Sequence, residues 1–474
     1  MLPILLLFLA AADPETQLRT ALATRTGAVT LPAGIIEISR EIVLPADAHD
    51  LNIQGNSRGN TGDNTTTIKA AASFRGRSLL VLPAGKNIRI HDLALDGNRD
   101  AVARPTGLPP SEAMFARFTQ NNGILAEGVT GLEIDSVKAT AIAGFAILVN
   151  AGHTVKIHDI EVSESGGLNA RKRNNSTGGI LLEEGTTDFE VLNCRIANVR
   201  GNGIWTHSLY RSPRNARGRI AGNEFVMLAR DAIQVGHATE IRVENNRGRM
   251  IGYPAEEVDL ETQAFPVAVD TAGNVDKSVY RNNRFEEIDG KCFDLDGFHD
   301  GEVSGNTCLN EEPVKSYPYG NYGIIMNNAN PDMQSRNIRV VNNTIDGVLF
   351  GGIFIIGQGH TVTGNHLLHM NLAHCNDPGP INCGYSPNQP DLLRTGIYLG
   401  AGAERPDIAK GNTVTGNEIS GYGMSRHCLG AAPGVSLAAN TIAKNECSDE
   451  AVLARLQRRR EEPLVARRQP AKPR

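Results

Sequence analysis

Three aspartates of this chain are spaced in a way that suits acid–base chemistry. Asp294 and Asp296 lie two residues apart in an alternating apolar–acidic segment, and Asp270 ends an earlier segment of the same kind. Such alternation is typical of a β-strand, so Asp294 and Asp296 are expected on one side of it, about 6.6 Å apart. Crowded carboxylates have diverging pKa values, so one can donate a proton while another activates water. We therefore predict Asp270, Asp294 and Asp296 as catalytic residues.

The same three carboxylates have two other interpretations. Carboxylate oxygens are also the ligands that Ca²⁺ prefers, so Asp270, Asp294 and Asp296 could hold calcium. They could also be ordinary solvated charges. The sequence contains no zinc-ligand spacing, phosphate loop or dinucleotide fingerprint. Calcium is thus the one cofactor considered, and the acid–base hypothesis requires none.

A repeat indicates the elements that position these side chains. Asn recurs shortly before an apolar residue, with a base period of 22–23 residues that insertions lengthen to 30, 37 or 52. A small residue, often Gly, opens a second kind of alternating segment. The Asn positions are Asn193, Asn223, Asn246, Asn283, Asn306, Asn343, Asn365, Asn417 and Asn440. The openings are Gly123-Ile124, Gly179-Ile180, Gly203-Ile204, Ala232-Ile233, Gly323-Ile324, Gly352-Ile353 and Gly396-Ile397.

The length of this repeat predicts a solenoid. A unit of about 23 residues with three short strands cannot bury its apolar face alone. Stacked units can, because each strand pairs with its copies in the coils above and below at about 4.8 Å. The Asn column is predicted to be structural, since Asn tolerates a left-handed turn and its amide can bond to the Asn of the next coil.

An N-terminal signature accompanies the repeat. The amphipathic stretch Thr16–Thr24 precedes the segments Gly27–Gly34 and Leu51–Gly55. Together with the Asn turns and the Gly-Ile strands, this pattern resembles the right-handed parallel β-helix superfamily of pectate lyases, polygalacturonases and related carbohydrate-active proteins. The resemblance implies an all-β fold, a single-stranded right-handed parallel β-helix (solenoid) with an N-terminal capping helix. It also implies a groove on the sheet of Gly-Ile strands, in which a sugar chain lies across the coils.

Alternation within the Gly-Ile strands predicts which side chains face this groove. The inward positions are almost wholly apolar, which supports the register. The first outward column is predicted to run Leu125, Leu148, Leu181, Trp205, Gln234, Ala268, Asp294, Ile325, Phe354 and Tyr398. The second is predicted to run Glu127, Asn150, Glu183, His207, Gly236, Asp270, Asp296, Asn327, Ile356 and Gly400. In this register Asp270 lies one coil from Asp296.

The implied groove gives the outward residues their predicted roles. His207 can exchange a proton near neutral pH and joins the aspartates as a catalytic residue. Trp205, the single Trp, and Tyr398 are expected to stack on sugar rings. The predicted substrate-binding residues are Trp205, Glu183, Gln234, His237, Asn327, Tyr398 and His299. Insertions at 163–178, 209–219, 250–263, 310–321 and 371–394 are expected to form the walls of the groove.

We favour a secreted enzyme that hydrolyses a polysaccharide or oligosaccharide with a carboxylate acid/base pair. The chain lacks the adjacent Asp-Asp pair on a groove strand and the Arg-x-Lys of polygalacturonases, so it departs from that family. A Ca-dependent polyuronate lyase or C5-epimerase is the first alternative. The outward columns contain no Lys or Arg that could be the base, but six cations crowd two groove-side loops: Arg171, Lys172, Arg173, Arg211, Arg214 and Arg217. A non-catalytic sugar-binding or surface adhesin solenoid is the second alternative.

Composition and the chain ends complete the prediction. Residues 1–12 look like a short signal peptide, 13–447 form the β-helix domain, and 448–474 form a basic tail that we expect to be disordered. The net charge of −5 argues against nucleic acid as a partner, and no apolar run is long enough to span a membrane. We expect a secreted or periplasmic protein with a polysaccharide partner, and monomer and homo-oligomer both stay open.

Seven cysteines agree with export. Cys375 and Cys383 could form one bridge, and Cys428 and Cys447 another. The odd number leaves at least one free thiol.

Overall fold

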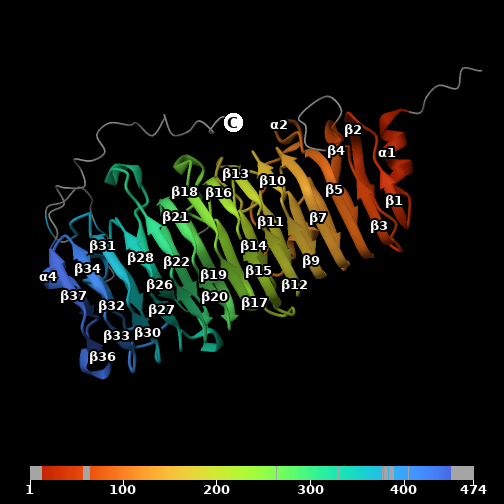
Figure 1. Ribbon diagram of the computed structural model, residues 1–474. Helices are drawn as coiled ribbons and strands as arrows, with labels where there is room; N and C mark the ends of the chain where they lie inside the picture. The colour runs from red at the N-terminus through yellow and green to blue at the C-terminus, as the bar shows by residue number, and fades with distance from the viewer. Residues whose placement is uncertain are drawn as a thin grey trace, which may run out of the picture.

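The computed structural model describes residues 13–56, 65–262, 264–327, 331–375, 377, 383, 389–403 and 405–449. In this part of the chain the named strands pair in parallel and stack into one elongated solenoid that runs from α1 to β37 (Figure 1). The predicted all-β parallel β-helix is therefore confirmed. The predicted leader 1–12 and nearly all of the predicted tail lie outside the described residues, while β37 carries the solenoid to Asp449.

Each coil contributes strands to three parallel sheets. The Gly-Ile strands form the first sheet, and β17 and β19 continue from it into the second. Its strands are β6 (Asn122–Glu127), β8 (Ile147–Asn150), β11 (Ile180–Glu183), β14 (Ile204–His207), β17 (Ile233–Glu244), β19 (Val267–Asp276), β22 (Lys291–Asp296), β26 (Tyr322–Asn327), β29 (Ile353–Ile355), β32 (Ile397–Leu399) and β35 (Leu429–Ala431).

The second sheet follows the first along each coil. Its strands are β1 (Gly27–Thr30), β3 (His49–Gln54), β5 (Lys86–Asp96), β7 (Thr130–Thr140), β9 (His153–His158), β12 (Thr187–Leu192), β15 (Asn215–Ala221), β20 (Val279–Arg281), β23 (Phe298–His299), β24 (Glu302–Ser304), β27 (Arg339–Val341), β30 (Thr361–Thr363), β33 (Thr413–Thr415) and β36 (Thr441–Ala443).

The third sheet also receives the ends of β5 and β7, and it completes the coil. Its strands are β2 (Ile35–Val43), β4 (Thr67–Leu82), β10 (Glu161–Ser163), β13 (Arg195–Val199), β16 (Glu224–Leu228), β18 (Arg247–Ile251), β21 (Arg284–Ile288), β25 (Thr307–Leu309), β28 (Thr344–Asp346), β31 (His366–Met370), β34 (Glu418–Gly421) and β37 (Glu446–Asp449).

Helices are few and short. The α-helices are α1 (Pro14–Leu22), α2 (Arg99–Val102), α3 (Phe115–Phe118) and α4 (Met424–His427). Single 3-10 turns occur at η1 (Ala255–Glu257), η2 (Val314–Ser316), η3 (Pro331–Met333), η4 (Leu392–Arg394) and η5 (Leu437–Ala439). In the described part of the chain, none of these helices has the length and apolarity that a membrane crossing needs.

The predicted capping helix is α1, which begins and ends two residues before the predicted stretch. Asp13 caps it, because its carboxylate accepts a hydrogen bond from the Thr16 backbone N–H at 3.1 Å. Leu18 and Leu22 are buried and pack with the core of the first coils. The helix thereby covers apolar surface that no preceding coil could cover.

The interior consists of stacked aliphatic rows. Ile147 pairs with Ile124 and Ile180, and Ile204 pairs with Ile180 and Ile233, all fully buried. Identical branched side chains at the spacing of neighbouring strands fill a narrow interior efficiently. The predicted first inner column is confirmed over these coils.

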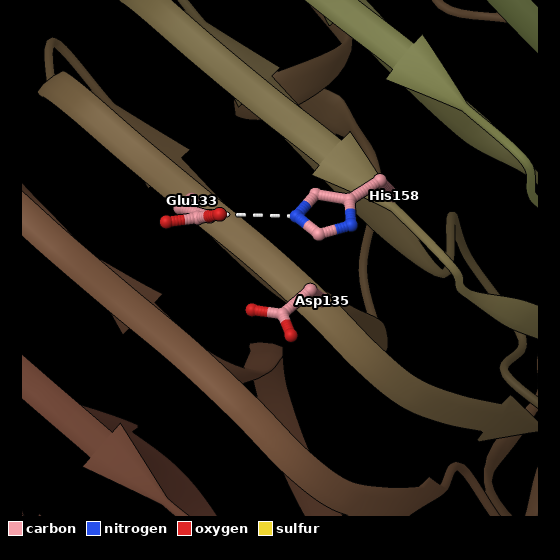
Figure 2. A group of neighbouring side chains, drawn as sticks. All are labelled: Glu133, Asp135 and His158. Atoms are coloured by element: carbon pink, nitrogen blue, oxygen red, sulfur yellow. Dashed lines mark hydrogen bonds and ion pairs between the residues drawn. The ribbon is translucent and has the colours of Figure 1, made fainter.

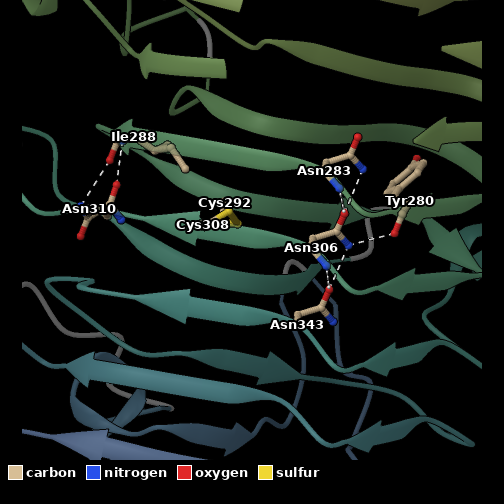
Figure 3. Close-up of a disulfide and its surroundings, with 9 residues drawn as sticks. Tyr280, Asn283, Ile288, Cys292, Asn306, Cys308, Asn310 and Asn343 are labelled. Carbon is tan, nitrogen blue, oxygen red and sulfur yellow. Dashed lines mark hydrogen bonds between the residues drawn. A yellow bond between two sulfur atoms is a disulfide. The ribbon is translucent and has the colours of Figure 1, made fainter. Parts of the chain in front are cut away.

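A ladder of buried asparagines fixes one turn of the coil (Figure 3). In the ladder, the Asn306 Nδ2 donates to the Asn343 Oδ1 at 2.9 Å and to the Tyr280 carbonyl at 2.9 Å. The Asn306 Oδ1 accepts from the Asn283 Nδ2 and backbone N–H. Each amide is thus fully paired, which lets it be buried without penalty. The members are Asn223, Asn246, Asn283, Asn306, Asn343, Asn365, Asn417 and Asn445.

Two of the nine predicted asparagines are not in this ladder. Asn193 lies one residue too early, and Cys194 takes the ladder position. Asn440 belongs to a separate short ladder, where its Oδ1 accepts from the Asn412 N–H at 3.0 Å. The residue with left-handed backbone geometry is the one before each ladder position, such as Asn193 with φ 54°, and not the ladder Asn itself.

Three disulfides and one free thiol account for the cysteines. Both predicted bridges, Cys375–Cys383 and Cys428–Cys447, are present. A third bridge joins Cys292 of β22 to Cys308 of β25 inside the core (Figure 3), and the sequence did not indicate it. Cys194 is the predicted free thiol; it is buried, and burial raises its pKa.

Candidate active site

The register of the first sheet differs from the predicted one at β19. The structure pairs Gln234 with Asp270 and Asp270 with Asp294, so these three side chains form one column, here called the acid column. The prediction placed Asp270 beside Asp296, two residues further along the strand, and was wrong. Inward and outward faces were nevertheless correct, because a shift of two residues preserves the alternation of the strand.

Each side chain of the acid column has a defined partner. The Asn202 Nδ2 donates to the Gln234 Oε1 at 2.8 Å, which turns the Gln234 Nε2 towards Asp270. That Nε2 donates to the Asp270 Oδ2 at 2.8 Å. The Lys291 ammonium pairs with the Asp294 Oδ2. Asp270 and Asp294 therefore differ in environment although they are neighbours on adjacent strands.

The charges around Asp270 and Asp294 make the two acids differ further. Asp270 is 8% exposed, and burial raises its pKa well above the usual value, with Asp231 and Asp294 adding repulsion. Asp294 is 5% exposed, and its negative charge faces the Lys291 ammonium. Burial acts to lower the pKa of Lys291, but the attraction of Asp294 and Asp270 outweighs it, so Lys291 stays protonated. Asp270 is thus suited to hold a proton, whereas Asp294 forms an ion pair with Lys291.

The third carboxylate of this cluster is Asp231. It is fully buried just before β17, where its Oδ1 accepts the Val267 N–H at 2.9 Å and its Oδ2 faces Arg230 at 3.2 Å. Burial raises its pKa, while Arg230 acts in the opposite direction. Two cations, Arg230 and Lys291, therefore flank three crowded acids. No pattern in the sequence indicates Asp231, Arg230 or Lys291, because their roles depend on how side chains bend at the ends of strands.

Asp296 lies beside this cluster in the second outward column. It pairs in register with Asn327, and both are half-buried. The Asn327 Oδ1 has no hydrogen-bond partner among the described residues. On the other side the column passes Ala272 and Gly236 to reach His207, since Gly236 pairs with Ala272. No long side chain of this column therefore separates Asp296 from His207.

The three predicted aspartates do not form a calcium-type cluster. Among the described residues, two groups of three acidic or His side chains bring ligand atoms within 4.8 Å of one another: Glu133, Asp135 and His158, and Glu183, Glu184 and His207. Asp270, Asp294 and Asp296 form no such group. The Lys291 ammonium also pairs with the Asp294 Oδ2, so a second cation would meet its positive charge, and of the two Asp294 oxygens only Oδ1 is without a hydrogen-bond partner among the described residues. The donor set therefore does not fit Ca²⁺.

A segment that the sequence analysis overlooked covers part of the first sheet. Residues 103–121, here called the strap, follow α2 and include α3. The Phe115 ring of the strap packs edge-on against Trp205 with ring centroids 4.8 Å apart. Trp205 does point away from the interior, as predicted, but it is 7% exposed, so the expectation of an open stacking face was wrong. The run Arg104–Ser111, rich in Pro and Gly, was the available signal for a long loop.

Glu183 fastens the strap to the sheet. Its carboxylate accepts the backbone N–H groups of Phe115 at 2.9 Å and Ala116 at 2.7 Å, and the Asn150 Nδ2 at 3.1 Å. Glu183 is 0% exposed, and burial raises its pKa to about 7, although these hydrogen bonds act in the opposite direction. Its predicted contact with substrate is therefore wrong, since the strap covers it.

A cleft of about 310 Å³ opens beside the strap. Trp205, His207 and Arg230 line its sheet side, and Phe115 and Thr262 line its rim. Burial lowers the pKa of His207 to about 4, so its ring is neutral at neutral pH. Its Nδ1 and the Trp205 Nε1 lack hydrogen-bond partners among the described residues. Arg230 connects this cleft, here called the Trp205 cleft, to the buried Asp231.

The remaining predicted binding residues lie away from the cleft. His237 is buried next to Tyr210, with ring centroids 4.9 Å apart, and burial lowers its pKa. His299 is buried in β23 of the second sheet, where Asp300 and Asn274 contact its ring nitrogens at 2.8 and 3.1 Å. Tyr398 is fully buried, so its predicted sugar-stacking face was wrong.

The loops that border the first sheet are tied to each other by ion pairs. Arg171 of the 163–178 loop pairs with Asp259 at 3.1 Å and with Glu261. Arg200 pairs with Glu257 at 3.4 Å. The 209–219 insertion follows β14 instead of preceding a Gly-Ile strand, and its Arg211 pairs with Glu112 of the strap at 3.1 Å. Arg171 and Arg211, which were expected to meet an anionic substrate, therefore form ion pairs between the loops that border the first sheet.

A second charged cluster lies on another face of the solenoid. The His158 Nε2 lies 3.0 Å from the Glu133 Oε1, across neighbouring strands of the second sheet (Figure 2). Arg89 binds both oxygens of Asp135 at 2.8 and 3.0 Å. Burial acts against the charge of His158, but Asp159 and Glu133 raise its pKa overall. A His whose pKa is raised by carboxylate partners and an arginine-bound Asp are poor metal ligands, so we assign this cluster to cross-strand charge pairing.

Comparison with known proteins agrees with this architecture. Residues 115–249 match the family described as "Right handed beta helix region". The chain resembles this family over that stretch, and its described strands form a parallel β-helix that extends beyond it on both sides. The predicted superfamily fold is thereby confirmed. No curated protein sequence matches the chain.

Solved β-helix structures resemble the chain at low sequence identity. The tailspike protein of E. coli bacteriophage HK620, in complex with a pentasaccharide, has a TM-score of 0.54 and 11% identity, over 92% of this chain and 75% of that one. PfbA, a surface adhesin of Streptococcus pneumoniae, has a TM-score of 0.50 and 12% identity, over 93% of this chain and 90% of that one. The Azotobacter vinelandii mannuronan C-5 epimerase AlgE6 A-module has a TM-score of 0.50 and 13% identity, over 93% of this chain and 96% of that one. The chain spans 66% of the Dettilon tailspike protein.

Proposed function

We propose that the protein hydrolyses a glycosidic bond on the first sheet, with Asp270 as general acid. The observation that carries this proposal is the buried Asp270, whose pKa is raised by burial and by Asp231 and Asp294. A carboxylic acid that stays protonated at neutral pH can protonate the leaving oxygen of a sugar. The structures that share the fold include a tailspike bound to a pentasaccharide, which supports a glycan as ligand.

The neighbouring acids fit the other roles of such a reaction. Asp294 lies beside Asp270 on the next strand, and its negative charge would face the positive charge that develops on the sugar ring. Asp296 lies two residues further, diagonal to Asp270, which places the two backbones about 8 Å apart. A separation of this size between the two carboxyl groups would leave room for a water between acid and base, as in an inverting glycosidase. We therefore assign Asp296 as the general base.

The test is a glycan panel with product analysis on three variants and a control. We expect D270N and D296N to lower kcat by at least about 100-fold, the usual contribution of a general acid or base. D294N should lower kcat as well, because it removes the charge opposite the sugar. D188N is the matched control, since Asp188 is a half-exposed partner of Arg217 on the second sheet. Full activity in D270N on a substrate that the wild type cleaves would refute the proposal.

Elimination or C5 epimerisation of a uronate is the second candidate. It is favoured by the cations Arg230 and Lys291 beside the acids and by the neutral His207, which lines the Trp205 cleft together with Arg230. A cation can neutralise the uronate carboxylate, and a neutral His can remove the C5 proton. An unsaturated product that absorbs in the ultraviolet, together with loss of activity in H207Q, would favour elimination. Hydrolysis predicts saturated products and an active H207Q.

A binding function without turnover is the remaining outcome of the panel. Glycan binding with no product from any substrate would assign the chain to the adhesin class. Three disulfides fit an oxidising compartment, so we also propose that the protein acts outside the cytoplasm.

A further inference from the structure

A second cavity, of about 200 Å³, is lined by the strap and by residues of the N-terminal coils. The strap residues Pro109 and Phe115 line both this cavity and the Trp205 cleft. On the sheet side, its wall includes Ala143 and Thr177, which precede β8 and β11. We call it the strap pocket. The strap pocket therefore lies next to the Trp205 cleft, on the side of the N-terminal coils.

The strap pocket carries positive charge that the protein does not neutralise. Arg75 and Arg104 line it, and neither has an ion-pair partner among the described residues. Both side chains are exposed and bond only backbone carbonyls: Arg75 donates to that of Phe74, and Arg104 to those of residues 101–103. No Asp or Glu occurs among the described residues that line the pocket. By contrast, Arg117 of the same strap lies 4.0 Å from Glu127.

The inner wall of the pocket offers a polar group without a partner. Thr119 is 7% exposed and lines the pocket, and its Oγ1 forms no hydrogen bond among the described residues. A buried hydroxyl without a partner costs free energy unless a ligand or water supplies one. Phe118 and Val102 add apolar wall beside it. The pocket therefore combines an apolar face, a buried hydroxyl and two cations at the rim.

We propose that the strap pocket binds a carboxylated sugar unit of the glycan that the acid column acts on. The apolar face of a pyranose ring would lie against Phe118, a ring hydroxyl would pair with the Thr119 Oγ1, and the carboxylate would meet Arg75 and Arg104. The proposal rests on the proposed function and specifies its substrate class as an acidic glycan. From β8 to β22 there are five strand spacings, about 24 Å, so an oligosaccharide can occupy both places.

The test measures binding of a galacturonate hexamer in the D270N background, where no turnover disturbs the titration. We expect R75Q/R104Q to weaken binding by about tenfold or more, because two charge-assisted hydrogen bonds are lost. T119V should weaken it less. Binding should also fall between about 0.05 M and about 0.5 M salt, since both arginines are exposed. Neutral maltohexaose should bind weakly and equally to all variants.

The matched control is R117Q, which removes one positive charge from the same strap outside the pocket. Equal weakening by R117Q and R75Q/R104Q would overturn the proposal, because the effect would then be general charge. Equal binding of maltohexaose and the galacturonate hexamer would overturn it too. If D270N fails to fold, as judged by circular dichroism and by Trp205 fluorescence, the D296N background replaces it.

The outcomes separate this proposal from the proposed function. Hexamer binding that depends on Arg75 and Arg104, with no hydrolysis by the wild type of any acidic glycan, would leave the pocket in place and refute hydrolysis. Hydrolysis of neutral glycans, unchanged in R75Q/R104Q, would support the catalytic acids and refute the acidic substrate.

Discussion

At the scale of single residues, the surroundings of a carboxylate decide what it can do. Asp270 and Asp294 are identical side chains on neighbouring strands, yet an amide contacts one and an ammonium contacts the other. Glu183 shows the same principle in a structural role, because its burial under the strap raises its pKa to about 7. A raised pKa in a buried acid is therefore no proof of catalysis. The two cases differ in their partners, because Asp270 faces the acids Asp231 and Asp294, whereas Glu183 binds backbone N–H groups of the strap.

Glu183 makes the stability of the protein depend on pH. Its pKa rises from 4.5 to about 7 on folding, so the folded state binds more protons between these values. The stabilisation is fully present below about pH 4.5 and is lost as the pH rises through about 7, about 3 kcal/mol in total. We expect the free energy of unfolding of the wild type to fall, relative to E183Q, between pH 4.5 and 8. Urea titrations across this range measure it, and a constant difference would contradict the assignment.

At the scale of elements, alternation in a strand fixes which face a side chain occupies but not which residue of the next strand it meets. The first sheet illustrates this, since Val267 and Val269 both satisfy an inward position opposite Ile233, and the structure selects Val269. The strap has no periodicity at all. Its place over the sheet follows from contacts of Phe115 and from the carboxylate of Glu183.

The fluorescence of Trp205, the single Trp of the chain, reports on the position of the strap. Phe115 packs against Trp205 and Phe145, with ring centroids 4.8 and 5.7 Å apart. F115A should destabilise the protein by about 3 kcal/mol or more and let water reach the indole. We therefore expect the fluorescence of Trp205 to shift to longer wavelength in F115A. F118A, which removes an aromatic ring of the same helix that lies in the strap pocket, is the control and should leave the emission nearly unchanged.

The asparagine ladder predicts that the loss of stability on removing one Asn depends on its place in the solenoid. In N306A, the Asn283 Nδ2 and N–H lose their acceptor, and the Asn343 Oδ1 and the Tyr280 carbonyl each lose the Asn306 Nδ2 as donor. Buried groups left without partners cost about 1–3 kcal/mol each, so we expect a loss of several kcal/mol. N440A, at the exposed end of the second ladder, should cost less than about 1 kcal/mol. Thermal unfolding of both variants measures the difference, and equal losses would argue against the ladder.

At the scale of the whole molecule, each coil contacts mainly its neighbours, so the ends are the weak points. Helix α1 covers the first coil, and the Cys428–Cys447 bridge ties α4 to β37 at the other end. The site lies between these ends, in β14 to β22. Rigid coils hold its residues at the strand spacing, whereas loops and the strap shape the walls.

Removal of the terminal bridge should loosen one end and leave the site intact. We expect C428S/C447S to lower the stability by about 3 kcal/mol, as for a loop of this length. Hydrogen exchange should accelerate in β34 and β37, while β14 and β22 keep their protection. Exchange that accelerates evenly over all coils would show that the solenoid unfolds as one unit instead.

The sequence by itself determined the solenoid, the capping helix, the faces of the Gly-Ile strands and two of the three disulfides. These depend on periods of about 23 and of two residues, which can be read along the chain. Tertiary structure decided that Asp270 lies beside Asp294, that Lys291 and Arg230 bend towards the acids, and that the strap covers Trp205 and Glu183. The physical reason is that burial and charge pairing depend on which coil, loop and side-chain rotamer come together, and no period in the sequence records that.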